Sequence, residues 1–392
     1  MFIRIFIRPK KILISIFLLI FFSLLIMNTR NTTIPTQTSS MQFKVVVDAG
    51  HGSIDTGTSY GEVLEKEINL EIAKFLEEEL KKVNIIPIMT RTEDKLYMDS
   101  RRQDIKRRPQ IANEANADLF ISIHANNYPS SQPKGSQIFY KKNSEDSKIL
   151  AEYIKEELVE IREANNRSNQ VGDFLVLNML KCPGVLIEVG FLSNGEDRKK
   201  LKDPIYQESL ARAIRKGIVT YFQEGFAETP KDISTIKSFE DTKKEELSIN
   251  EVNNVLYYQI ATENNIHHFK YKLSFPSSNF FNEDYTLLSF KEIMAITAIE
   301  ELLEAPDGLI SPLPKETKIN SLVIKDNIAV LDLSIEASEN FNGGASIEQL
   351  SVNAIKNTLF SIEGINGLQI LIDGESGKSL GGHIFFDDIY MR

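Results

Sequence analysis

Short apolar, β-rich runs alternate with amphipathic helical segments between Phe43 and Phe222, and this alternation constrains the fold most. The first run, FKVVVDAG, ends at a glycine turn, and the segment LEKEINLEIAKFLEEELKKV after it has apolar residues at helical spacing. Chains that alternate in this way form layered α/β folds with a largely parallel sheet. We therefore predict an α/β domain at residues 42–225, with an open, twisted, mixed but largely parallel sheet and flanking helices.

A second, smaller unit follows a polar, charge-mixed segment at residues 226–248, which is typical of a linker. The order of its elements predicts an α+β domain at residues 249–392 with β-α-β-β-α-β connectivity, in which one sheet carries two helices. The expected elements are strands at 255–262 and 270–275, a helix at 290–304, a hairpin that turns at Asp326-Asn327, a helix at 347–361 and a strand in LQILIDG.

The first 30 residues have the pattern of an export signal. Basic residues precede an apolar run from Ile12 to Met27, which as a helix would be about 24 Å long, somewhat short of a bilayer core. A basic flank before an apolar stretch indicates either an uncleaved signal anchor or a cleaved signal peptide, and both remain open. We expect residues 31–41 to form a tether and the rest to lie outside the cytoplasm, membrane-anchored or secreted.

Composition excludes two classes of protein. The net charge of −10 argues against nucleic acid as a partner, because surfaces that bind phosphate are usually basic. The single cysteine, Cys182, cannot form an internal disulfide, so neither unit is a disulfide scaffold. We expect Cys182 to be a small buried residue and not a nucleophile.

Polar residues interrupt the apolar runs where predicted strands end. His51 lies in DAGHG, His124 in SIHAN and Glu188 in LIEVGFLSN, while Glu65 precedes the first helix. Ligands of open α/β sheets bind beyond the carboxyl ends of the strands. Two histidines and a carboxylate suit a catalytic Zn²⁺ site with one open position, and a second carboxylate would carry the proton. The residues alone leave structural histidines and a helix-capping Glu65 as alternatives.

The sequence segments that contain these residues resemble those of a known family. VVVDAGHGSIDTG, LEKEINLEIA, ADLFISIHANN and GVLIEVGFLSN resemble, in order, the zinc-dependent N-acetylmuramoyl-L-alanine amidases of the Amidase 3 type. The resemblance implies hydrolysis of the amide between N-acetylmuramic acid and L-alanine of peptidoglycan stem peptides. It implies His51, Glu65 and His124 as zinc ligands and Glu188 as the catalytic acid/base.

The segment SRRQDIKRRPQIANEANAD resembles the germination-specific amidases of endospore formers, which prepare cortex peptidoglycan. Its arginines contact anionic peptidoglycan groups or form a solvated helix face, and we favour the solvated face. These arginines are Arg101, Arg102, Arg107 and Arg108.

Three further polar residues have two interpretations each. Arg91 contacts substrate or forms a structural ion pair. Asp48 orients His51 or only forms a turn. Asn126 orients substrate or caps its loop.

The C-terminal unit resembles the GerMN domain of sporulation and germination proteins, through AIEELLEAPDGLISPLPKETKINSLVIKDNIAVLDLS, LSVNAIKNTLFSIEGINGLQILIDG and LGGH. The resemblance implies a contact with an envelope or sporulation protein and carries no catalytic motif. We expect His383 and Asp373 to stabilise turns. We expect His267 and His268 to be surface residues in a loop.

The leading hypothesis is a zinc amidase of spore cortex maturation or germination at the spore envelope. The alternatives are a non-catalytic envelope scaffold with an amidase-like fold and an amidase of vegetative wall turnover. The fused second unit also raises the hypothesis that another protein must order the zinc site before the enzyme is active.

Overall fold

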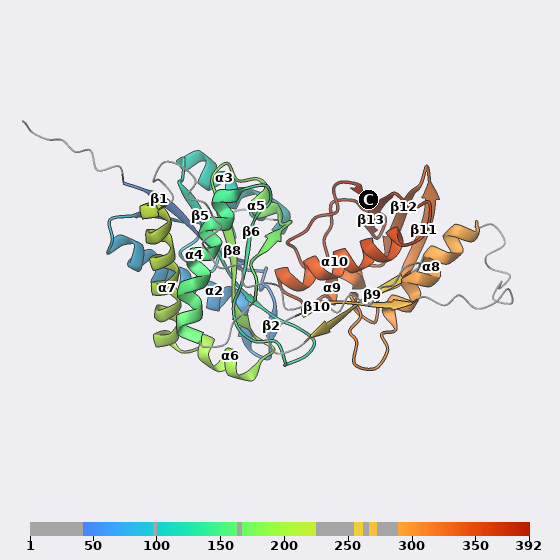
Figure 1. Ribbon diagram of the computed structural model, residues 1–392, viewed down its shortest axis with the longest axis horizontal. Coiled ribbons are helices and arrows are strands. Elements are labelled where there is room, and N and C mark those ends of the chain that lie inside the picture. The colour runs from blue at the N-terminus through green and yellow to red at the C-terminus, as the bar shows by residue number, and fades with distance from the viewer. Residues whose placement is uncertain (1–41, 97–99, 163–166, 225–254, 262–265, 273–288) are drawn as a thin grey trace, which may run out of the picture. The chain divides into compact units, whose positions relative to one another are not determined.

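A six-stranded mixed sheet organises the first half of the chain in the computed structural model (Figure 1). The strand order is β4-β1-β5-β8-β6-β7; neighbouring strands run parallel except β6 and β8, which are antiparallel. The predicted mixed, largely parallel sheet is therefore confirmed. The strands are β1 (Lys44–Ala49), β4 (Ile86–Met89), β5 (Leu119–Asn126), β6 (Gln137–Lys141), β7 (Gln170–Gly172) and β8 (Gly184–Phe191). A short hairpin, β2 (Ser59–Tyr60) with β3 (Val63–Leu64), precedes the first helix.

The structure describes residues 42–96, 100–162, 167–224, 255–261, 266–272 and 289–392. The predicted export signal, tether and linker all lie outside these residues. Within the described ranges, no helix is both long enough and apolar enough to cross a membrane.

Helices cover both faces of the sheet because side chains alternate along each strand. Val45 and Val47 of β1 pack into a core with α2, α4 and α7, whereas Val46 packs with residues of α3 and α5. The helix predicted in LEKEINLEIAKFLEEELKKV is α2, and further helices flank the sheet as predicted. The helices are α2 (Glu65–Lys81), α3 (Arg101–Ala115), α4 (Glu145–Arg162), α5 (Leu175–Asn178), α6 (Gly195–Leu201) and α7 (Pro204–Glu224).

The C-terminal half is α+β, as predicted, but its strands form two sheets. A four-stranded sheet has the order β11-β12-β13-β14, and β9 pairs with β10 in a separate antiparallel hairpin. The expected single sheet is therefore wrong, because β9 pairs with its chain neighbour. The elements are β9 (Val255–Ala261), β10 (Ile266–Lys272), α8 (Phe290–Leu303), β11 (Ile319–Lys325), β12 (Ile328–Leu333), α9 (Glu336–Glu339), α10 (Ala345–Phe360), β13 (Gly367–Ile372) and β14 (Tyr390–Met391).

Two local predictions in this half have opposite outcomes. The β11–β12 hairpin turns at Asp326-Asn327 as predicted, and both residues have positive φ, which a tight two-residue hairpin turn requires. His267 and His268 lie in β10 and not in a loop, which is a correction. His267 is exposed, and His268 is half-buried with Nε2 2.8 Å from the carbonyl oxygen of Leu350.

One apolar cluster contains side chains from both predicted domains. Phe120, Phe174 and Leu180 belong to the same buried cluster as Leu333 and Phe386. By its internal contacts the whole stretch Phe43–Arg392 is one unit. The two halves therefore share a core, and the boundary between them remains a prediction.

Cys182 lies in this cluster, and we predict that its thiol is unreactive in the folded chain. Burial raises the pKa of Cys182 to about 11, and the thiolate is the form that attacks disulfide reagents. A chromogenic disulfide reagent at pH 8 should label the native chain slowly and the urea-unfolded chain fast. The Cys182→Ala variant provides the blank. Fast labelling of the native chain would contradict this placement.

Candidate active site

The loop after β1 carries His51 over the carboxyl edge of the sheet. His51 has a φ of 62°, in the left-handed region, so the chain turns sharply after Gly50. A Cβ on Gly50 would lie 2.2 Å from a ring carbon of His124, so only glycine allows the two segments to approach so closely. The local sequence thus sets the distance between the two histidines.

The structure brings the four predicted site residues together. Nε2 of His51 lies 3.3 Å from Oε2 of Glu65, and Nδ1 of His124 lies 2.8 Å from Oε1 of Glu65. His124 on β5 pairs in register with Glu188 on β8, at the same edge of the sheet. All four side chains are buried.

The electrostatics of these residues follow from burial and mutual charge. Burial would raise the pKa of Glu65, but His51 and His124 hold it well below its usual value. Burial and the negative charge of Glu65 raise the pKa of Glu188 well above its usual range. Burial lowers the pKa of His124 to about 4. Against the effect of burial, Asp55 and Glu65 raise the pKa of His51 to about 9, so this position attracts a positive charge.

Asp55 orients His51, and Asp48 does not. Oδ2 of Asp55 lies 2.8 Å from Nδ1 of His51, which leaves Nε2 without a hydrogen bond of normal geometry among the described residues. Asp48 instead accepts hydrogen bonds from Thr90, Ser122 and Arg108. The suggestion that Asp48 orients His51 is therefore wrong, because both oxygens of its carboxylate are bound by other side chains.

The position of Arg108 contradicts both interpretations of the arginine-rich segment, contact with peptidoglycan and a solvated helix face. Its guanidinium is buried and pairs with Asp48 and Asp104, and it also donates to the carbonyl oxygens of Ala49 and His51. It neither lies on a solvated face nor is available to substrate. Sequence alone missed this because a buried arginine has the same pattern as an exposed one.

The other three arginines of this helix, α3, differ from one another. Arg107 pairs with the exposed Glu114, as a solvated face predicts. Arg101 donates to the carbonyl oxygen of Gly381, and Arg102 pairs with Asp387. Two of the arginines thus bind the C-terminal half of the chain.

Arg91 and Asn126 have structural contacts. Arg91 is buried and donates to the carbonyl oxygens of Ala49, Gly50 and Lys66, so it holds the loop after β1 and forms no contact open to substrate. Asn126 is buried at the end of β5, where its Oδ1 accepts the backbone N–H of the next residue. This contact matches the loop-capping alternative.

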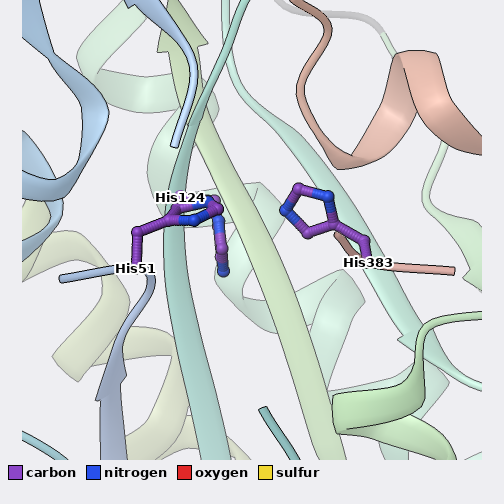
Figure 2. A group of neighbouring side chains, drawn as sticks. All are labelled: His51, His124 and His383. Carbon is purple, nitrogen blue, oxygen red and sulfur yellow. The ribbon is translucent and has the colours of Figure 1, made fainter. Parts of the chain in front are cut away.

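His383 is the residue that sequence reasoning missed. It was expected to stabilise a turn, yet it lies beside His51 and His124, and one ligand atom from each of the three lies within 4.8 Å of the others. Figure 2 shows the three imidazoles at one centre. The sequence signal was only the GGH turn, and nothing local connects that turn to the distant DAGHG loop.

A small cavity lies between these residues. Its volume is about 20 Å³, and it is lined by Gly50, His51, His124, Gly382 and His383, with Asp48, Asp55, Ile105, Arg108 and Val176. A space of this size holds about one water molecule or ion. The centre at the carboxyl edge of the sheet contains two imidazoles, a carboxylate and a second buried carboxylate. Such a set of side chains is typical of metal-dependent hydrolases.

The sequence matches two families. Residues 45–220 match the family described as N-acetylmuramoyl-L-alanine amidase, and residues 272–378 match the one described as sporulation and spore germination. The germination-specific N-acetylmuramoyl-L-alanine amidase of Bacillus subtilis is 37% identical over 190 residues, which are 46% of this chain and 80% of that protein. The chain belongs to the N-acetylmuramoyl-L-alanine amidase family.

Other relatives match a share of the chain of the same size. The amidase LytC of Bacillus subtilis is 36% identical over 181 residues. The matched region is 46% of this chain but only 35% of that protein. The solved structure of the CwlD amidase from Clostridioides difficile, in complex with the GerS lipoprotein, is 37% identical. That match covers 46% of this chain and 99% of the other, with a TM-score of 0.45.

We predict that Arg108→Met destabilises the fold by about 3–5 kcal/mol, because it leaves two buried carboxylates without their cation. Urea unfolding of residues 43–392 measures the loss. The matched control is Arg107→Met on the same helix, which removes an ion pair with the exposed Glu114 and should change the free energy of unfolding by less than about 0.5 kcal/mol. Equal losses in the two variants would contradict the assignment.

Proposed function

We propose that the chain is a zinc-dependent amidase that hydrolyses the bond between N-acetylmuramic acid and L-alanine of peptidoglycan stem peptides. The observation that carries the proposal is the convergence of His51, Glu65 and His124 on one buried centre beside Glu188. The substrate class follows from the family to which the chain belongs.

The residues of this centre fit zinc. Two imidazole nitrogens and a carboxylate oxygen are ligands that zinc accepts, and they leave one position open for chemistry. Nε2 of His51 is buried without a normal hydrogen bond in the described structure. A Cβ on Gly57 would lie 2.5 Å from Oε2 of Glu65 and 2.6 Å from a ring carbon of His51, so the loop is shaped closely around the ligand atoms. When bound, zinc polarises the scissile carbonyl and favours ionisation of a water molecule.

The protein's own groups orient the ligands and move the proton. Asp55 accepts Nδ1–H of His51, which keeps Nε2 of that ring free to bind. The backbone N–H groups of Thr58 and Ala125 donate to Glu65 and hold its carboxylate in place.

Glu188 is the acid/base of the proposed reaction. It takes a proton from water as the oxygen bonds to the carbonyl carbon, then gives it to the leaving nitrogen of L-alanine as the C–N bond breaks. Its raised pKa makes the carboxylate a stronger base for the first step, and it keeps the proton on the carboxyl until the leaving nitrogen takes it in the second.

The cellular setting follows from both family matches. We infer an extracytoplasmic role in spore cortex maturation or germination, with cortex peptidoglycan as substrate and an envelope or sporulation protein as a partner of the C-terminal half. The first 30 residues remain predicted as an export signal or membrane anchor.

The proposal predicts zinc-dependent release of peptides that begin with L-alanine. Purified cortex peptidoglycan is incubated with the chain and zinc, beside a chelated control, and the products are identified by mass spectrometry. Because His383 lies at the centre, the His383→Ala variant is assayed in parallel. Release by either protein, only with zinc, together with peptide-free muramic acid, is the expected result. No release by either protein would contradict the amidase assignment.

We predict that Glu188→Gln abolishes turnover, because a glutamine side chain cannot carry the proton. The variant should still bind zinc, because Glu188 is not one of the proposed ligands. His124→Ala should lose zinc and turnover together. Both changes are made in whichever protein shows turnover, the parent chain or His383→Ala. Metal content is measured by atomic emission, and peptide release is measured beside it. Glu67→Gln, an exposed position on the first turn of α2, is the control and should behave as the parent. Normal turnover in Glu188→Gln would overturn the site assignment.

A further inference from the structure

The C-terminal half of the chain reaches into the proposed metal centre. Resting on the proposed zinc amidase function, we propose that His383 is a fourth ligand of the zinc and that its segment is an intramolecular inhibitor of the enzyme.

Glu348 fixes the orientation of His383. The carboxylate of Glu348 is fully buried, and its Oε2 accepts both the backbone N–H and the Nδ1–H of His383, each at 2.9 Å. Nε2 of His383 is then the free nitrogen, and it has no hydrogen-bond partner among the residues described. The Asp55–His51 pair has the same arrangement, with a carboxylate on Nδ1 and a buried Nε2 that lacks a normal hydrogen bond. A carboxylate on the far nitrogen is how proteins prepare histidines to bind metals.

His383 completes a set of four zinc ligands. Its ring centroid lies 5.3 Å from that of His51 and 5.3 Å from that of His124, and all three rings meet at the centre in Figure 2. With Glu65 these are three nitrogens and one oxygen, enough for tetrahedral zinc. Structural zinc sites are closed in this way, whereas catalytic sites keep one position open. His383 therefore occupies the position that hydrolysis requires.

The start of α10, in the same half of the chain as His383, closes the path to Glu188. The cavity at the centre has a volume of about 20 Å³, room for about one water molecule and far less than a muramyl peptide needs. Glu188 is fully buried, and the backbone N–H groups of Ala345 and Ser346 lie close enough to favour its charged form, although neither oxygen has a hydrogen bond of normal geometry in the described part of the chain. A Cβ on Gly344 would lie 2.6 Å from Oδ1 of Asn126, so the start of α10 fits tightly against the end of β5.

Polar contacts around the centre hold two parts of the C-terminal half in place, Asn342 just before α10 and the loop that carries His383. Asn127 donates to the carbonyl oxygen of Asn342 at 2.8 Å, and Thr58 donates to its side-chain oxygen at 2.8 Å. The backbone N–H of Leu175 donates to the carbonyl oxygen of His383 at 3.2 Å. Arg101 and Arg102 bind the flanking residues Gly381 and Asp387. Such contacts are individually modest, because water replaces them on opening.

Cobalt substitution tests the ligand directly, without reference to turnover. The full chain is loaded with Co²⁺, and its visible spectrum is recorded with and without azide, which binds only at an open position. Azide should leave the parent spectrum unchanged and shift the spectra of His383→Ala and His383→Gln. Zinc affinity, measured by chelator competition, should fall by about tenfold or more in both variants and also in Glu348→Gln.

Turnover of cortex peptidoglycan should rise by about tenfold or more in His383→Ala and His383→Gln, because both changes open the blocked coordination position and remove one of the contacts that hold the C-terminal half over the centre. The matched control is His267→Ala, which removes an exposed imidazole from β10 and should behave as the parent in every assay. Circular dichroism verifies that each variant is folded.

The outcomes separate this inference from the proposed function. An azide response in the parent, or unchanged zinc affinity in both His383 variants, would overturn His383 as a ligand. Loss of cobalt binding in both folded variants would make His383 essential to the site and overturn its inhibitory role. Equal, measurable turnover in the parent and in His383→Ala would also overturn the inhibitory role. The expected cobalt spectra without peptide release by any variant would support His383 as a ligand and contradict the amidase function.

Discussion

The buried pairing of Arg108 with Asp48 fixes the loop on which the rest of the site depends. β1 ends at Ala49, and the chain then turns through residues whose carbonyl oxygens have no strand partner. Arg108 and Arg91 donate to these oxygens, so the loop is held by two guanidinium groups where regular structure stops. The negative charges of Asp48 and Asp104 are what make it possible to bury Arg108. The fixed loop in turn gives His51 one position over the edge of the sheet.

From this loop outward, the centre is built from repeated pairs of imidazole and carboxylate. Asp55 holds His51, Glu65 contacts both His51 and His124, and Glu348 holds His383. Asp55 and Glu348 each place negative charge behind a ring, whereas Glu65 lies at the centre itself, beside Nε2 of His51. Together these charges leave the centre able to accept a cation. Glu188 is the exception, since among the described residues no imidazole forms such a pair with it, and burial and the negative charge of Glu65 raise its pKa.

Periodicity and the placement of polar residues predicted the sheet and the meeting of His51, His124 and Glu188. The reason is geometric, because parallel strands end at one edge and residues at their ends must approach one another. Asp55 was missed in favour of Asp48, since the turn between them is set by φ angles that the sequence pattern does not specify. Arg108 was missed because helix periodicity does not distinguish a buried ion pair from a solvated one.

His383 could not be predicted for a different reason: the contact joins two halves that match separate families and share a core. No motif within either half encodes a ligand supplied by the other. If the metal takes ligands from both halves, its binding and the closure of the chain are thermodynamically linked. Metal then stabilises the closed arrangement, and anything that opens the centre must also weaken the hold on the metal. Latency and metal retention would thus be two consequences of one contact between the two halves of the chain.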